Sequence, residues 1–147
     1  MARFYDLDRA NARVPELRDI LELLRDQRAE LIRQRDLVLE RQSAVEAGNE
    51  AGPGSARGAS EDDEPDDELR LIRLRMQGLI DQMQAGVARI DALGITLRDI
   101  ESGLIDFPAL TSGRQIWLCW RLGEEEVGWW HELSTGFSDR RPLIELA

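Results

Sequence analysis

The chain has 147 residues, enough for one ordinary domain or for one small domain with an extended appendage. Hydrophobic residues make up 42% and charged residues 33%, so the composition is too apolar for a wholly disordered chain and too charged for a membrane protein. The formal net charge is −10, and most of the excess lies in residues 48–68, where one arginine stands against eight acids. No basic stripe is present, so we expect no nucleic-acid partner.

The sequence also bears on the location of the protein. No stretch approaches the roughly 20 apolar residues of a membrane helix, and residues 1–13 lack the apolar core of a secretory signal. Cys119 is the only cysteine, which excludes an internal disulfide framework. We therefore expect a cytoplasmic protein with no membrane partner. All 19 cations are arginines, so chemistry that requires a lysine is excluded.

Residues 1–47 predict a short N-terminal turn followed by one long helix. Asp6 is suited to N-cap the opening turn, and Pro15 either starts a new helix or kinks a continuous one. Residues 16–47 contain no glycine or proline. Large apolar residues recur there every seven positions, which is typical of a helix with one apolar stripe: Leu17, Leu24, Leu31, Val38 and Val45.

Residues 48–67 combine Gly, Ser and Pro with a run of acids, and we interpret them as a disordered linker. A second helix is expected over residues 68–94, with Gly94 as its C-terminal stop. Because a lone helix of this length is marginal in water, it should pack antiparallel on the first helix, with the linker at the hairpin tip. Leu71 and Leu74 fall off the shared seam, so we expect self-association through the helices.

Residues 95–147 predict a small β region, because six of the eight aromatic residues lie there. The clearest unit is a hairpin of residues 115–122 and 127–133, joined by Gly-Glu-Glu-Glu. A shorter strand over residues 104–107 is expected to end at Pro108.

The two faces of this hairpin depend on its register. If Leu122 pairs with Val127, His131 belongs to an apolar face that packs on the helices. The opposite face then carries Trp117, Cys119, Arg121, Trp130 and Glu132. That second face is either a small core covered by the C-terminal segment or a surface for a ligand or partner, with Arg121 within reach of a cation–π contact to Trp130.

The motifs of common enzyme classes are missing. One cysteine and one histidine cannot assemble a Cys/His zinc site, and this register places Cys119 and His131 on opposite faces. A site that joins His131 to Asp106 or other carboxylates stays open as an alternative. No phosphate-binding loop, dinucleotide fingerprint or serine-hydrolase elbow occurs. We therefore predict no cofactor, no metal and no catalytic residue.

Residues 134–142, Ser-Thr-Gly-Phe-Ser-Asp-Arg-Arg-Pro, are loop-like and contain two adjacent arginines. Arg140 and Arg141 either hold an anion with nearby backbone amides or pair with acids of Glu124–Glu126 or Glu132.

Three groups of residues, at the start, in the middle and at the end of the chain, resemble the bacterial proteins catalogued as domain of unknown function 2203. They are Tyr5-Asp6-Leu7 with Ala10-Asn11 and Pro15-x-Leu17; Leu93-Gly94, Asp99 and Gly103-Leu104-Ile105-Asp106-Phe107-Pro108; and Trp120-Arg121-Leu122-Gly123-Glu124, Trp130-His131, Gly136-Phe137 and Arg140-x-Pro142. The resemblance implies a soluble bacterial protein of unassigned activity and supplies no catalytic residues. The acidic linker departs from the family pattern as an insertion at the hairpin tip.

Together these patterns predict an α+β protein of one structural domain, in which a long antiparallel, coiled-coil-like helical hairpin packs on a small antiparallel sheet of three to four strands. We expect a non-enzymatic interaction or scaffold module that self-associates and binds an unknown protein or small anionic ligand. Its candidate binding surface is Trp117, Arg121, Trp130, Glu132, Asp106, His131 and Arg140. The alternative is a small-ligand- or anion-binding protein or enzyme that uses Asp106, Arg121, His131, Glu132 and Arg140.

Overall fold

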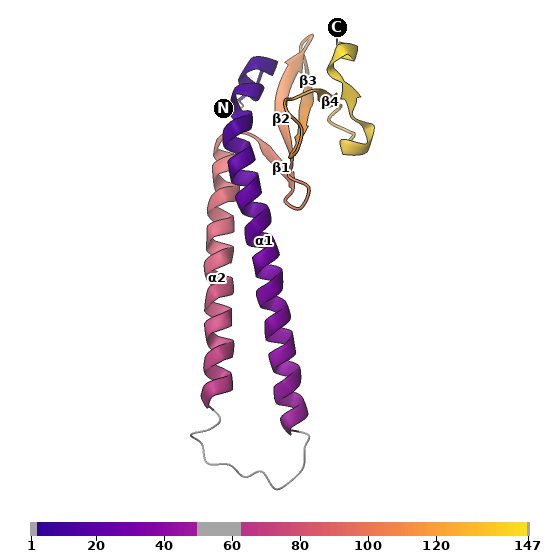
Figure 1. The fold of residues 1–147 in the computed structure, drawn as a ribbon. Coiled ribbons are helices and arrows are strands. Elements are labelled where there is room, and N and C mark those ends of the chain that lie inside the picture. The colour runs from indigo at the N-terminus through magenta and orange to yellow at the C-terminus, as the bar shows by residue number, and fades with distance from the viewer. Residues whose placement is uncertain (1–2, 50–62, 147) are drawn as a thin grey trace. The chain divides into compact units, whose positions relative to one another are not determined.

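The computed structural model describes residues 3–49 and 63–146, which form an α+β fold. Two long helices, α1 (Leu7–Asn49) and α2 (Asp63–Ala92), precede a five-stranded antiparallel sheet (Figure 1). The predicted fold class is confirmed, with five strands in place of three to four. Most of the predicted linker, residues 50–62, lies outside the described residues, and the helices continue over its two ends.

Local hydrogen bonds define the start of α1 and the end of α2. The Arg9 amide donates to Asp6 Oδ1 at 2.8 Å, so Asp6 caps the start of α1, and Pro15 lies inside this single helix. At the end of α2, the Ile95 amide donates to the Ile90 carbonyl and the Gly94 amide to the Asp91 carbonyl. This is a Schellman motif, and Gly94 has the positive φ of +75° that the motif requires.

The strands follow one another as a simple meander, each paired with its neighbour in sequence. The outer strands are short, and two 3-10 turns, Phe137–Asp139 and Leu143–Leu146, flank the last strand. The strands are β1 (Thr96–Asp99), β2 (Leu104–Thr111), β3 (Arg114–Arg121), β4 (Trp129–His131) and β5 (Arg141–Pro142).

The prediction that Pro108 ends a strand is wrong, because β2 runs through it to Thr111. The Pro108 carbonyl accepts the Tyr5 amide at 2.8 Å, on the side of β2 away from β3 and beyond the end of β1. A missing amide proton costs little there, because no strand would receive it. The chain then turns at Ser112 and Gly113, both with positive φ, as in the tight turns that join hairpin strands.

The predicted register of the second hairpin is wrong by one residue. Leu118 pairs with Trp130, and Cys119 pairs with Trp129. The connection is also longer than four residues, because Val127 donates its amide to Asn11 Oδ1 of α1 at 2.7 Å. A shift of one residue exchanges the faces of β4, so His131 joins Cys119 on one face and Trp130 moves to the other.

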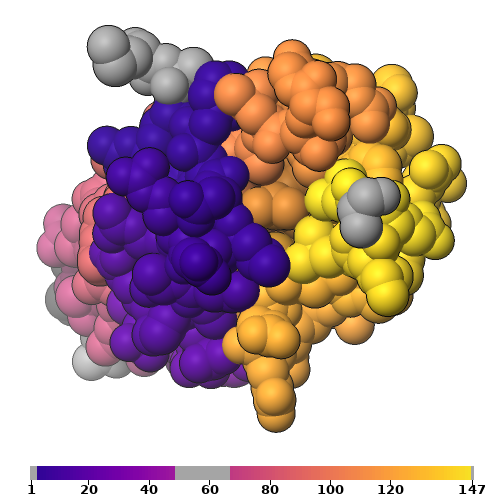
Figure 2. All heavy atoms as spheres, turned by 90° about the horizontal axis from the view of Figure 1, so that it is seen from above, coloured from indigo at the N-terminus to yellow at the C-terminus, as the bar shows by residue number. Residues whose placement is uncertain are grey.

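By their contacts, the residues divide into two compact units, Met1–Asp26 with Gln84–Ala147 and Gln27–Met83. In the first unit, the sheet face that includes Phe107 meets the start of α1, and Figure 2 shows these segments side by side. The rings of Tyr5 and Phe107 make an edge contact at 5.2 Å. The buried apolar residues of this core come from both segments: Ala10, Val14, Leu17, Leu21, Leu24, Ile105, Phe107, Ile116, Leu118, Trp120 and Trp130.

The second unit is a pair of antiparallel helical segments. Gln27 Nε2 donates to Gln82 Oε1 at 3.1 Å, and Arg41 forms an ion pair with Glu68. Within this unit's described side chains only Leu69, Ile72 and Gln27 are buried. Over the described residues, neither helix combines the length and apolar character needed to cross a membrane.

Candidate functional site

Three potential metal ligands meet on the sheet face opposite the Phe107 core. Asp106 comes from β2, Cys119 lies directly across from it on β3, and His131 comes from β4. All three are buried, with exposed fractions of 2%, 0% and 2%. One carboxylate oxygen, the thiol sulfur and one imidazole nitrogen all lie within 4.8 Å of one another. The prediction that Cys119 and His131 lie on opposite faces is therefore wrong.

The imidazole of His131 is held between two oxygen atoms. Its Nδ1 lies 2.8 Å from the backbone carbonyl oxygen of Glu132, and its Nε2 lies 3.0 Å from Asp106 Oδ2. A carbonyl oxygen only accepts hydrogen bonds, so the Nδ1 atom carries a proton. The Nε2 atom therefore lies at hydrogen-bond distance from the Asp106 carboxylate. A proton on Nε2 or another cation is needed to bridge these two atoms.

The Asp106 carboxylate is only partly satisfied. Its Oδ2 atom accepts a hydrogen bond from Arg98 Nε at 2.8 Å in addition to the His131 contact. Its Oδ1 atom is buried and has no hydrogen-bond partner. An unpartnered carboxylate oxygen in a protein interior is costly, which makes this atom the clearest sign of a missing ligand in the cluster.

The Cys119 thiol is in surroundings that favour its neutral form. Burial, and to a lesser extent the negative charge of Asp106, raise the pKa of Cys119 to about 12, while the Arg140 guanidinium opposes this rise. A protonated, inaccessible thiol is a poor nucleophile.

Arginines and aromatic rings cover the cluster. Arg140 forms an ion pair with Glu124 at 3.0 Å, and its guanidinium lies 4.4 Å from the Trp129 ring centroid and 4.3 Å from that of Phe137. Arg98, which bonds to Asp106, lies 5.0 Å from the centroid of Trp117. This agrees with the interpretation of the face as a small second core under the C-terminal segment.

The other residues of the predicted binding surface do not lie together in the structure. Trp117 is half-buried on the cluster face, but Trp130 is buried on the opposite face and contacts Arg141 at 5.6 Å. The predicted Arg121–Trp130 contact is wrong, since Arg121 lies over Phe137 at 5.1 Å. Glu132 binds Arg114 at 2.5 Å. Of the predicted ligand-binding residues, the structure thus brings together Asp106 and His131, with Arg140 near the adjacent Cys119.

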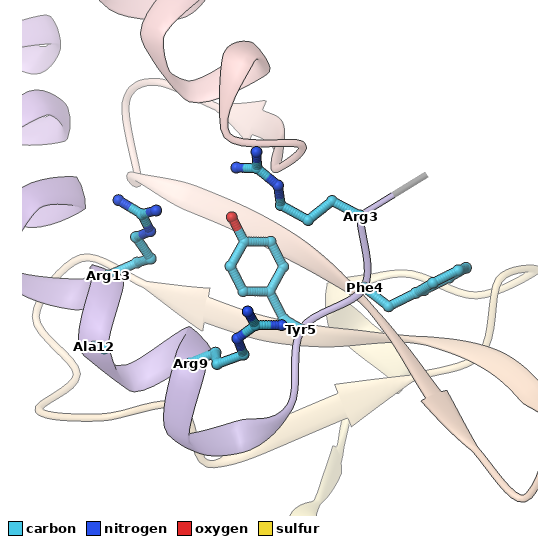
Figure 3. Close-up of a pocket in the computed structure, with 6 residues that line it drawn as sticks. All are labelled: Arg3, Phe4, Tyr5, Arg9, Ala12 and Arg13. Atoms are coloured by element: carbon cyan, nitrogen blue, oxygen red, sulfur yellow. The ribbon is translucent and has the colours of Figure 1, made fainter. Parts of the chain in front are cut away.

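A separate concavity of about 540 Å³ lies at the N-terminal end of the described chain (Figure 3). Figure 3 shows Arg3 and Arg13 reaching toward the hydroxyl end of the Tyr5 ring, with Arg9 near its base and Phe4 pointing away. Ala12 completes the described part of the lining, which contains no acid, and Arg13 pairs with Glu16 at 3.2 Å. Sequence reasoning missed this group because its arginines are spread over eleven positions without a motif.

Comparison with known proteins gives one family match. The family model described as "Uncharacterized conserved protein (DUF2203)" matches residues 3–143. No curated protein and no solved structure gives a significant match.

Proposed function

The chain belongs to the DUF2203 family of uncharacterized conserved proteins, and we propose that it is a non-enzymatic interaction module that self-associates through its helical hairpin. The observation that carries this proposal is the thin packing of the unit Gln27–Met83. Its described part buries few side chains, while five large apolar residues stay at least 39% exposed: Leu37, Leu39, Val45, Leu71 and Leu74.

Helices of this length need packing to be stable in water, because their ordering costs about 1–2 kcal/mol per residue. Leu71 and Leu74 lie one turn apart on α2 and are 52% and 62% exposed. A second copy of the same hairpin is the occupant we propose for this surface. The unit Gln27–Met83 carries eight arginines against thirteen acids, but eight of those acids lie in residues 48–68. The remaining segments, 27–47 and 69–83, carry seven arginines against five acids, so two copies would repel each other little along them.

The non-enzymatic part of the proposal rests on access to the titratable cluster. Asp106, Cys119 and His131 are buried, and none of them is among the described residues that line three surface concavities, the N-terminal one included. The N-terminal concavity has cationic walls but no histidine, cysteine or carboxylate in its lining. His, Glu and Asp are the common general acids and bases, and Tyr5, the titratable group of the described lining besides the arginines, donates its hydroxyl proton to the Leu93 carbonyl oxygen.

Sedimentation and light scattering of the full chain over a range of concentrations test self-association. We expect an oligomer that the double variant Leu71→Glu, Leu74→Glu converts to a monomer, because four buried charges would then meet in each pair of copies. The matched control places the same substitutions at Leu110 and Leu133, which are 54% and 52% exposed on the other unit. A monomeric wild-type chain, or an oligomer that survives the first double variant, would refute the proposal.

The alternative function is the binding of a small anion, and the N-terminal concavity favours it. Arg3, Arg9 and Arg13 line this space, and guanidinium groups bind oxyanions through charge-assisted hydrogen bonds. We expect calorimetry at low salt to detect binding of inorganic phosphate. The double variant Arg3→Gln, Arg9→Gln should weaken it by about tenfold or more, since such bonds contribute about 1.5–3 kcal/mol each.

The matched control for anion binding is Arg70→Gln, Arg73→Gln, which removes the same charge from exposed positions of α2. Equal weakening by both double variants would mean that phosphate responds only to net charge, and this alternative would then be dropped.

A further inference from the structure

We propose that Asp106, Cys119 and His131 form a binding site for one divalent transition-metal ion of the zinc class. The site is independent of self-association, because all three residues belong to the sheet and none to the unit Gln27–Met83.

The three donor atoms have the chemistry and the spacing of a zinc site. Thiolate, imidazole and carboxylate are the three protein groups that zinc takes as ligands. With bond lengths of about 2.0–2.3 Å, the donors of a tetrahedral zinc ion lie about 3.5 Å apart. The three donor atoms here are all within 4.8 Å of one another, and the His131–Asp106 pair is already at 3.0 Å. Side-chain adjustments of about 1 Å would complete the set.

The His131 ring is oriented as a metal ligand. Its Nδ1–H donates to the Glu132 carbonyl oxygen at 2.8 Å, which fixes the ring and leaves the Nε2 lone pair directed at the cluster. Metal-binding histidines in proteins are usually oriented by this kind of bond from the other ring nitrogen. A metal ion can therefore bond to Nε2 in place of the proton that would otherwise bridge this nitrogen to Asp106 Oδ2.

The Asp106 carboxylate has one oxygen without a hydrogen-bond partner among the described residues. The Arg98 guanidinium and His131 use only Oδ2, so Oδ1 is available for coordination without loss of the Arg98 bond. A bound cation would satisfy this buried atom, which has no partner among the described residues.

The competing explanation is a buried ion pair between an imidazolium and Asp106, with Cys119 as a small apolar neighbour. That pair would satisfy Nε2 and Oδ2 but would leave Oδ1 of Asp106 unpartnered. It also assigns no role to the position of Cys119 opposite Asp106. A metal ion bound to Asp106 Oδ1 and to the Cys119 sulfur would account for both observations. The two explanations therefore differ in whether the Cys119 sulfur bonds to a metal.

Binding is a ligand exchange without any redox change. The Cys119 S–H bond breaks, its proton leaves to solvent, and the sulfur lone pair forms the bond to the metal; any proton on His131 Nε2 is displaced in the same way. Asp106 contributes a carboxylate oxygen. The product joins three adjacent strands, and it anchors β4, which has only three residues, to β2 and β3.

Cobalt(II) titration of the full chain, stripped of metal with a chelator, tests the site. We expect one Co²⁺ per chain and a near-ultraviolet sulfur-to-cobalt charge-transfer band. Because Cys119 is the only cysteine, the band identifies the ligand without any variant. Zinc should displace the cobalt and abolish the band. A folded wild-type chain that takes up Co²⁺ without this band, or takes up none, would overturn the proposal.

Variants then test the other two ligands, with circular dichroism as the measure of folding. His131→Gln and Asp106→Asn should each lower the Co²⁺ affinity by at least about 100-fold, the upper end of what loss of an outer-shell partner costs. Glu125→Gln, which removes an exposed carboxylate from the β3–β4 connection, is the matched control and should bind normally. Unchanged affinity in a folded His131→Gln variant would contradict the role of the imidazole. If neither variant folds, the wild-type band and its displacement by zinc decide the question.

Discussion

Gly103 shows how one residue can fix the geometry between two strands. Its φ is +68°, and a Cβ atom built on it would lie 2.5 Å from Leu122 Cβ. Its carbonyl also accepts the Leu122 amide at 2.9 Å, so the two backbones cannot easily move apart. We expect Gly103→Ala to lower the free energy of unfolding by about 2–5 kcal/mol, as the sum of left-handed strain and overpacking. Urea denaturation measures this change.

Gly113 provides the control for that substitution. Its φ is +76°, but a Cβ atom there would meet nothing within 4 Å. Gly113→Ala should therefore cost only the backbone strain, about 1–2 kcal/mol. Equal losses for the two variants would show that the contact with Leu122 relaxes without cost.

Residue identity alone predicted the features that depend on local chemistry. Asp6 caps its helix, Gly94 ends the other, and Arg140 pairs with Glu124, one of the two outcomes considered for it. Residue identity alone did not predict which side chains lie next to each other across the sheet. Cys119 and His131 are twelve positions apart, and their proximity depends on the strand register.

At the scale of elements, two strand predictions are wrong. The register of β3 and β4 depends on long-range contacts, and the end of β2 is set by a turn that the prediction did not include. The hydrophobic pattern of β3 and β4 permits two registers, and the Asn11–Val127 hydrogen bond, 116 residues apart in sequence, accompanies the observed one. A prediction from local sequence patterns cannot include a bond over that separation. The Ser112-Gly113 turn, in contrast, is a readable hairpin signal, and it explains why β2 continues past Pro108.

The helices were easier to predict because their signals are repetitive. Seven-residue periodicity, uninterrupted by glycine or proline over residues 16–47 of the first helix, predicted both of them. Contacts such as Arg89–Glu16 and Gln27–Gln82 confirm their antiparallel pairing. The two-residue strand β5 was missed, since a strand of that length has no periodicity of its own and depends on pairing with β4.

At the scale of the whole molecule, the division into two units separates the two proposals. The unit that contains the sheet has its own core, with Leu17, Phe107 and Trp120 fully buried. The unit Gln27–Met83 carries the exposed leucines and no member of the Asp106–Cys119–His131 cluster. Removal of the second unit should therefore abolish self-association and leave the metal site intact.

A chain in which a short Gly/Ser loop replaces residues 27–83 makes this separation measurable. The Gln27 and Gln82 side chains are hydrogen-bonded at 3.1 Å, so a loop of about five residues can join the two cut helix ends. We expect this shortened chain to unfold cooperatively, to keep the near-ultraviolet dichroism of its buried tryptophans, and to retain the cobalt band, while sedimenting as a monomer. If it lost its tertiary dichroism, the sheet core would depend on the hairpin. If it stayed oligomeric, self-association would have to be assigned to the sheet unit, because only that unit remains.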